Sequence, residues 1–209
     1  MTDLLDDDRN FALLHAPSPA RAAISALWTL DQRLGAIVAG TTQPMVGQMR
    51  MTWWHEALTT LKTDGRRGEP VLDALADNVL GRMGIDGVAL ARLVEGWEVM
   101  LDPLPLGMDS LATYAEARGS ALFSLMAKLL GRTSDDAAGR GWALADFAGH
   151  CSDAETATRA RAMAAEAFST ARIGQLPRPL RILARLAAGD IRRGSPIPRT
   201  FWRLIASIR

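Results

Sequence analysis

Apolar residues recur along this chain at intervals of three and four, the spacing that places side chains on one face of an α-helix. Between residues 20 and 39, the apolar stripe consists of Ala23, Leu27, Leu30, Leu34 and Ile37. The chain then breaks at Gly40–Gln43, and Pro44 stands where proline favours the start of a new helix. The pattern therefore predicts two consecutive helices, over 20–39 and 44–63.

The second of these helices repeats the apolar stripe with Val46, Met49 and Trp53, which we expect to face the core. The neighbouring methionines, Met45 and Met51, are likewise expected to fill the core. The same periodicity predicts further helices over 69–82, 86–101, 109–130, 134–151, 154–172, 179–189 and 198–208. Since no repeat or linker interrupts this pattern, we expect one all-α domain over 1–209, a bundle of eight or nine helices.

The composition agrees with a helical fold. The chain has 209 residues, of which 35 are alanine and 28 leucine, whereas only one is tyrosine and five are phenylalanine. Strands require more β-branched and aromatic side chains than this. The composition thus excludes a β-sandwich or β-barrel.

The charge is divided unevenly along the chain. Residues 172–209 contain nine arginines against Asp190, whereas residues 1–171 have a net charge of −7, so the total is only +1. A basic amphipathic C-terminal segment over 172–209 is typical of the interface with an anionic membrane. The membrane-facing residues are predicted to be Arg199, Trp202 and Arg203. Alternatively, the arginines pair with the acidic body; nucleic acid is disfavoured because stacking aromatic platforms are absent.

The N-terminal sequence, MTDLLDDDRN, is acidic where a secretory signal would be basic. No apolar run reaches 18 residues without a charge, so no spanning helix is expected. These features indicate a cytoplasmic protein, peripheral to the inner membrane if the basic segment binds lipid.

Motifs that carry catalytic chemistry by themselves are missing. The chain has no glycine-rich phosphate loop, no Cys/His metal spacing and no nucleophile elbow. Asp146 and His150 lie four residues apart and would form half a metal site at most. The pattern alone therefore describes only a helical domain.

Two segments resemble the squalene/phytoene synthase family. The first, Ala16–Leu58, has a proline and an arginine before an alanine-leucine-aromatic helix, a break, and then Arg-x-x-Trp-Trp. The second, Tyr114–Gly131, begins with tyrosine and has small residues two turns later. The matching residues are Pro17, Arg21, Ala26, Leu27, Trp28, Gly47, Arg50, Trp53, Trp54, Tyr114, Gly119, Ser120 and Ala121.

The resemblance implies an isoprenoid-synthase fold and a chemistry that needs two acidic clusters. Active members join two prenyl diphosphates head to head, and the clusters hold Mg²⁺ against the diphosphate. At the expected place of the first cluster this chain has Gly35, Ala36 and Ala39, without any carboxylate. The second cluster retains Asp146, Asp153 and Glu155, with Asp146 and Asp153 two helical turns apart. The resemblance therefore predicts no catalytic residue and no cofactor.

The segment GQMRMTWW, residues 47–54, is closer to a non-catalytic branch of the family that includes mitochondrial assembly factors for respiratory complex I. This likeness implies an accessory or assembly role, with a membrane-protein client or a prenyl or acyl ligand as partner. The candidate ligand-binding residues are Arg21, Arg50, Trp53, Trp54, Tyr114 and Ser120. Each also has a structural interpretation. For the arginines it is ion pairing or capping, and for the tryptophans it is core packing. For Tyr114 it is an orientation into the bundle with the hydroxyl on a polar partner, and for Ser120, with Gly119 and Ala121, close approach of helices.

Three hypotheses follow. The first is a catalytically degenerate family member that acts as an accessory, assembly or lipid-binding factor at the cytoplasmic membrane. The second is a Mg²⁺-dependent head-to-head prenyltransferase that uses a reduced metal site of Asp146, Asp153 and Glu155. The third is a helical partner of another subunit without a cavity, its centre filled by Trp28, Trp53 and Phe123.

Overall fold

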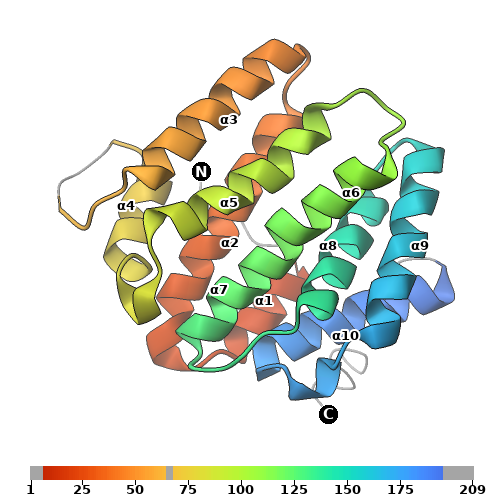
Figure 1. Cartoon of the computed structure of the whole chain (residues 1–209). Helices are drawn as coiled ribbons and strands as arrows, with labels where there is room; N and C mark the ends of the chain where they lie inside the picture. Colours follow the sequence, from red (N-terminus) through yellow and green to blue (C-terminus); the bar gives the residue numbers. More distant parts are fainter. Residues whose placement is uncertain (1–6, 65–67, 195–209) are drawn as a thin grey trace.

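The computed structural model describes residues 7–64 and 68–194, which form an all-α fold (Figure 1). The α-helices are α1 (Asp7–Leu14), α2 (Ser18–Ala39), α3 (Pro44–Thr59), α4 (Pro70–Asn78), α5 (Gly87–Glu98), α6 (Met108–Tyr114), α7 (Ala121–Leu129), α8 (Asp136–His150), α9 (Ala154–Thr170) and α10 (Arg178–Arg193). No β-strand occurs in these two ranges. The predicted fold class is confirmed.

The helix predicted over 109–130 is formed by α6, a π-helical segment (Ala115–Ser120) and α7, which follow one another without a break. Counted as one helix, they bring the described part of the chain to nine helices. The pattern missed α1, and α10 is longer than the helix predicted over 179–189. The helix predicted over 198–208 lies outside the described residues.

The helices surround α2 and α8 (Figure 1). α2 packs against α4, α5 and α7, and α8 packs against α9, α10 and the π-helical segment. α3 lies at one edge of the molecule, where its main neighbour is α5. Within the described ranges, no helix combines the length and apolar character needed to span a bilayer.

Aromatic side chains fill the centre between α2, α7 and α8. Trp28, Phe123 and Trp142 are buried, with the ring centroid of Trp142 lying 5.4 Å from that of Trp28 and 5.5 Å from that of Phe123. The predicted stripe of α2 is also buried. The third member of the expected central cluster, Trp53, does not belong to it.

The predicted core face of α3 is wrong. Its buried residues are Gly47, Met51, Trp54 and Leu58, whereas Met45, Val46, Met49 and Trp53 are exposed. Adjacent residues of a helix point about 100° apart, so only one of two neighbouring tryptophans can face α5. An edge helix buries one narrow stripe, and the apolar residues of the adjoining stripe remain at the surface.

Small residues allow the π-helical segment to cross α8 closely. A Cβ atom added at Gly119 would lie 2.4 Å from the carbonyl oxygen of Gly139, and one added at Gly139 would lie 2.6 Å from that of Gly119. Both distances are too short for a side chain. The expected role of the small residues near 119 in close helix approach is therefore confirmed.

Candidate functional site

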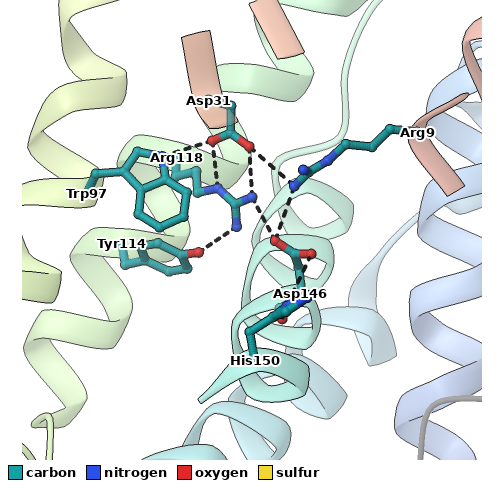
Figure 2. Close-up of polar contacts among 7 residues, drawn as sticks. All are labelled: Arg9, Asp31, Trp97, Tyr114, Arg118, Asp146 and His150. Atoms are coloured by element: carbon teal, nitrogen blue, oxygen red, sulfur yellow. Dashed lines mark hydrogen bonds and ion pairs between the residues drawn. The ribbon is translucent and has the colours of Figure 1, made fainter. Parts of the chain in front are cut away.

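The candidate site is a buried ion pair between α2 and the π-helical segment. Asp31 lies on the same face of α2 as Leu27 and Leu34 and is completely buried, as is Arg118. Arg118 donates from Nε to Asp31 Oδ1 and from Nη2 to Asp31 Oδ2, both at 2.8 Å (Figure 2). This two-point contact matches the planar guanidinium to the carboxylate and fixes the orientation of both.

Aromatic residues enclose the pair. The Nε1 atom of Trp97 donates to Asp31 Oδ1 at 2.9 Å, and Nη1 of Arg118 donates to the hydroxyl of Tyr114. The guanidinium carbon of Arg118 lies 4.6 Å from the ring centroid of Trp97 and 4.7 Å from that of Trp142. Cation–π contacts of this kind stabilise a guanidinium away from water. Tyr114 points into the bundle with its hydroxyl on a polar partner, as predicted.

A second carboxylate and a second arginine complete the cluster from the other side (Figure 2). Arg118 Nη2 donates to Asp146 Oδ2 of α8 at 2.7 Å. Arg9 of α1 reaches Oδ2 of both Asp31 and Asp146 at 3.4 Å. His150 turns its Nδ1 to the backbone oxygen of Asp146, at 2.8 Å. We call Arg9, Asp31, Arg118 and Asp146 the charge cluster.

The pKa values of Asp146, Arg118 and the neighbouring Tyr114 depart from their usual values. Burial by itself would raise the pKa of Asp146, but the charges of Arg118 and Arg9 outweigh it and hold this pKa below its usual value. Burial would likewise lower the pKa of Arg118, but the charges of Asp31 and Asp146 outweigh it and hold this pKa above its usual value. Burial raises the pKa of Tyr114, so its phenol stays neutral. At neutral pH Asp146 and Arg118 are therefore charged, whereas Tyr114 is neutral.

The residues present do not fit the Mg²⁺ that the family resemblance implies. Mg²⁺ requires oxygen ligands with free lone pairs and tolerates no cation among them. Arg118 lies between the carboxylates of Asp31 and Asp146, bound to both. At Gly35, in the expected first acidic cluster, an added Cβ would lie 2.9 Å from Cη2 of Trp97. The indole thus fills the space that a carboxylate there would need.

The other carboxylates of the expected second cluster lie apart from Asp146. Asp153 is the N-cap of α9 and accepts from the backbone nitrogen of Thr156 at 2.7 Å. Hydrogen bonds from the hydroxyl and from the backbone nitrogen of Thr156 lower the pKa of Asp153. Glu155 forms an ion pair with Arg159 on the surface of the same helix. Within residues 7–64 and 68–194, no three His, Cys, Asp or Glu residues gather where they could hold a metal ion.

The six predicted ligand-binding residues separate into four places. Arg21 donates to the carbonyl oxygens of Ala16 and Leu14, at 2.9 and 3.1 Å, so it caps the end of α1. Ser120 donates to Glu116 and to a backbone oxygen of α8, within the helix crossing. Tyr114 lies beside the charge cluster, where its hydroxyl accepts from Arg118.

Arg50, Trp53 and Trp54 are the three candidates that the structure brings together. They line a groove of about 270 Å³ between α2 and α3, with Arg33, Ile37 and Glu69. Arg33, on α2, forms an ion pair with Glu69 at 3.0 Å. The predicted membrane residues Arg199, Trp202 and Arg203 lie outside the described residues.

Reasoning from the sequence missed Asp31, Arg118, Trp97 and Arg9. One signal for Asp31 was present, because a carboxylate between Leu27 and Leu34 on an apolar stripe needs a buried partner. Arg118 follows Tyr114 by four residues and so lies on the same face of its helix. Nothing in the local pattern connects these two sites, which are 87 residues apart.

A larger pocket opens on the far side of Asp146, between α1, α8, α9 and α10. Its volume is about 410 Å³, and apolar side chains that include Trp142, Leu183 and Ile191 form part of its wall. His150 and Arg161 line it as well. A pocket of this size is large enough for a small molecule.

Of the comparisons with known proteins, one gives a match, to a family. No curated protein and no solved structure matches the chain significantly. The model of the squalene/phytoene synthase family matches residues 5–206, almost the whole chain. This chain therefore belongs to the squalene/phytoene synthase family.

Proposed function

We propose that this member of the squalene/phytoene synthase family does not transfer prenyl groups and acts as an accessory or assembly factor at the cytoplasmic membrane. The main support is Arg118, a buried guanidinium bound to both Asp31 and Asp146. A metal-dependent prenyltransferase needs carboxylates that are free to hold cations against the diphosphate.

The energetics of the charge cluster support an inactive site. Removing one partner of a buried ion pair leaves an uncompensated charge, which costs about 3–5 kcal/mol. A metal ion that took Asp31 or Asp146 as a ligand would have to displace Arg118 and incur a cost of this kind. The positions of the first acidic cluster offer no replacement, since they are Gly35, Ala36 and Ala39.

The packing of the bundle favours a partner-binding role over the carriage of a ligand in the centre. Trp28, Phe123 and Trp142 occupy the space between α2, α7 and α8. A prenyl or acyl chain is better accommodated in the pocket beside Asp146, where Trp142, Leu183 and Ile191 provide apolar contacts. The client we expect is a membrane protein.

The experiment is an assay of the purified protein with farnesyl or geranylgeranyl diphosphate and Mg²⁺, in which released diphosphate and hydrocarbon product are both measured. We expect no turnover above a protein-free control, while an active enzyme of the family gives product under the same conditions. We also expect no Mg²⁺-dependent rise in melting temperature with a diphosphate analogue. Product formation would contradict the proposal and support the second hypothesis, a head-to-head prenyltransferase.

A further inference from the structure

The outer face of α3 has an uninterrupted apolar row at the edge of the molecule. Met45, Met49 and Trp53 follow one another at intervals of four, so they lie on one stripe of the helix. They are 74, 68 and 50% exposed, and Val46 beside them is 38% exposed. α3 packs mainly against α5 on its opposite side. We call these four residues the α3 face.

The α3 face borders a groove that contains an unpaired arginine. Arg50 lines the groove between α2 and α3 together with Trp53 and Trp54. Among the described residues Arg50 has no hydrogen-bond or ion-pair partner, whereas Arg33 across the groove is paired with Glu69. Trp53 is held in place edge-to-face on the buried Trp54, with ring centroids 5.2 Å apart. An unpaired guanidinium beside a fixed, half-exposed indole is typical of the lipid headgroup region.

The size of the α3 face indicates the kind of partner. Only four side chains form it, whereas a standard protein–protein interface has roughly 20–30 residues on each side. A stable protein–protein interface buries about 800 Å² on each partner. An interfacial helix, in contrast, needs only one apolar stripe that enters the boundary between headgroups and acyl chains.

We propose that the α3 face is the surface with which this protein docks on an anionic phospholipid membrane. This inference rests on the proposed function at the membrane and assigns the contact to α3. Met45, Met49 and Trp53 enter the boundary of the acyl chains, and Arg50 contacts a lipid phosphate. The acidic Glu56 is exposed three residues beyond Trp53, so the contact extends over residues 45–53 and ends before Glu56.

The experiment is co-sedimentation of the full chain with vesicles of phosphatidylcholine, with or without phosphatidylglycerol. Met49→Asp should lower the partition coefficient roughly tenfold, because an anion replaces an inserted side chain. The matched control is Leu14→Asp on α1, since Leu14 is also 68% exposed and apolar. We expect that control to bind as the unchanged protein does. Met45→Asp gives a second reading, and circular dichroism verifies that each variant is folded.

Arg50→Gln tests the charge. One basic residue near an anionic leaflet contributes about 1 kcal/mol, so binding to phosphatidylglycerol vesicles should fall roughly fivefold. Binding to phosphatidylcholine alone should not change. Added salt should weaken binding of the unchanged protein more than that of Arg50→Gln, because screening removes the attraction that the variant already lacks.

Several outcomes would overturn the inference. One is that Met49→Asp and Met45→Asp bind vesicles normally while Arg199→Glu/Arg203→Glu abolishes binding, which leaves the membrane role intact but moves it to the C-terminal segment. Another is that the protein ignores vesicles and forms a dimer that Met49→Asp dissociates. Turnover of a prenyl diphosphate would instead refute the proposed function and leave the vesicle results unaffected.

Discussion

Arg118 shows how a buried cation is tolerated in this protein. All three nitrogens of its guanidinium donate a hydrogen bond, to Asp31, Asp146 or Tyr114. Indole rings of Trp97 and Trp142 lie within 5 Å of its central carbon. A buried charge is stabilising only with such complete pairing, because the desolvation penalty otherwise dominates. The consequence is that each partner depends strongly on the others.

The first prediction concerns this dependence. Arg118→Met should lower the free energy of unfolding by about 3–5 kcal/mol, because it leaves Asp31 buried without its counterion. Asp31→Leu should lower the free energy of unfolding by a similar amount, because it leaves Arg118 buried without this counterion. The measurement is urea denaturation followed by circular dichroism.

The double variant Asp31→Leu/Arg118→Met provides the control. If the two residues stabilise one another, the loss in the double variant is smaller than the sum of the two single losses by at least about 1 kcal/mol. Additive losses would contradict the coupling that the two 2.8 Å contacts indicate.

The interactions of single residues could be predicted from the sequence where both partners lie close together along the chain. The inward orientation of Tyr114 and the capping interpretation of Arg21 both followed from position along a helix, and the structure agrees with them. The partners of Asp31 could not be found in this way. They come from α1, α5 and the π-helical segment, whose meeting depends on the whole bundle.

Helix crossing determines where Arg118 lies. The π-helical segment passes α8 at Gly119 and α5 at Gly96, where an added Cβ would lie 2.8 Å from the backbone nitrogen of Arg118. Glycine at both crossings lets the backbone of this segment approach two helices closely. The side chain of Arg118 is thereby carried into the centre, between Asp31 and Asp146.

The second prediction tests the crossing with two glycines of the same helix. Gly139→Ala should destabilise the protein by about 2 kcal/mol, since its methyl group would overlap the carbonyl of Gly119. Gly149→Ala, also on α8, has nothing within 4 Å of the added Cβ. This variant should be stabilised by up to about 1 kcal/mol through helix propensity.

Thermal unfolding of the two variants, compared with the unchanged protein, measures the difference. Opposite shifts in melting temperature are expected. Equal shifts of the same sign would mean that the approach of α8 to the π-helical segment is not a tight contact in solution.

Periodicity predicted most helices but not the orientation of all of them. The stripe of α2 is buried as expected because partners surround that helix. On α3 two apolar stripes adjoin, and periodicity alone cannot decide which one meets α5. α1 escaped prediction because eight residues form barely two turns, too few for a period to be recognised.

At the scale of the whole molecule, acid should destabilise the fold, because protonation of Asp146 breaks the charge cluster. The pKa of Asp146 is lower in the folded protein than in the unfolded chain. Its ionised form therefore contributes stability that is complete above the unfolded pKa of about 4 and is lost as pH falls through the lower, folded value. The third prediction is that the free energy of unfolding falls steeply below about pH 4.

Asp146→Asn identifies the part due to this residue. The variant should be less stable than the unchanged protein at pH 7, and the difference should shrink as the pH falls through the folded pKa of Asp146, because both side chains are then neutral. Urea titrations at several pH values give the comparison. A difference that stays constant with pH would exclude Asp146 as a source of the acid sensitivity.

The contact between Gly35 and Trp97 also limits how this chain could acquire a metal site. An aspartate at position 35 would collide with the indole, so Trp97 would have to be replaced before a carboxylate could enter. Replacing Trp97 removes a hydrogen bond to Asp31 and a ring beside Arg118. Either substitution made first, an aspartate at position 35 or the replacement of Trp97, is therefore destabilising. A return to metal binding requires coordinated changes on α2, α5 and the π-helical segment. Loss of the acidic cluster is, in this structure, difficult to reverse by single substitutions.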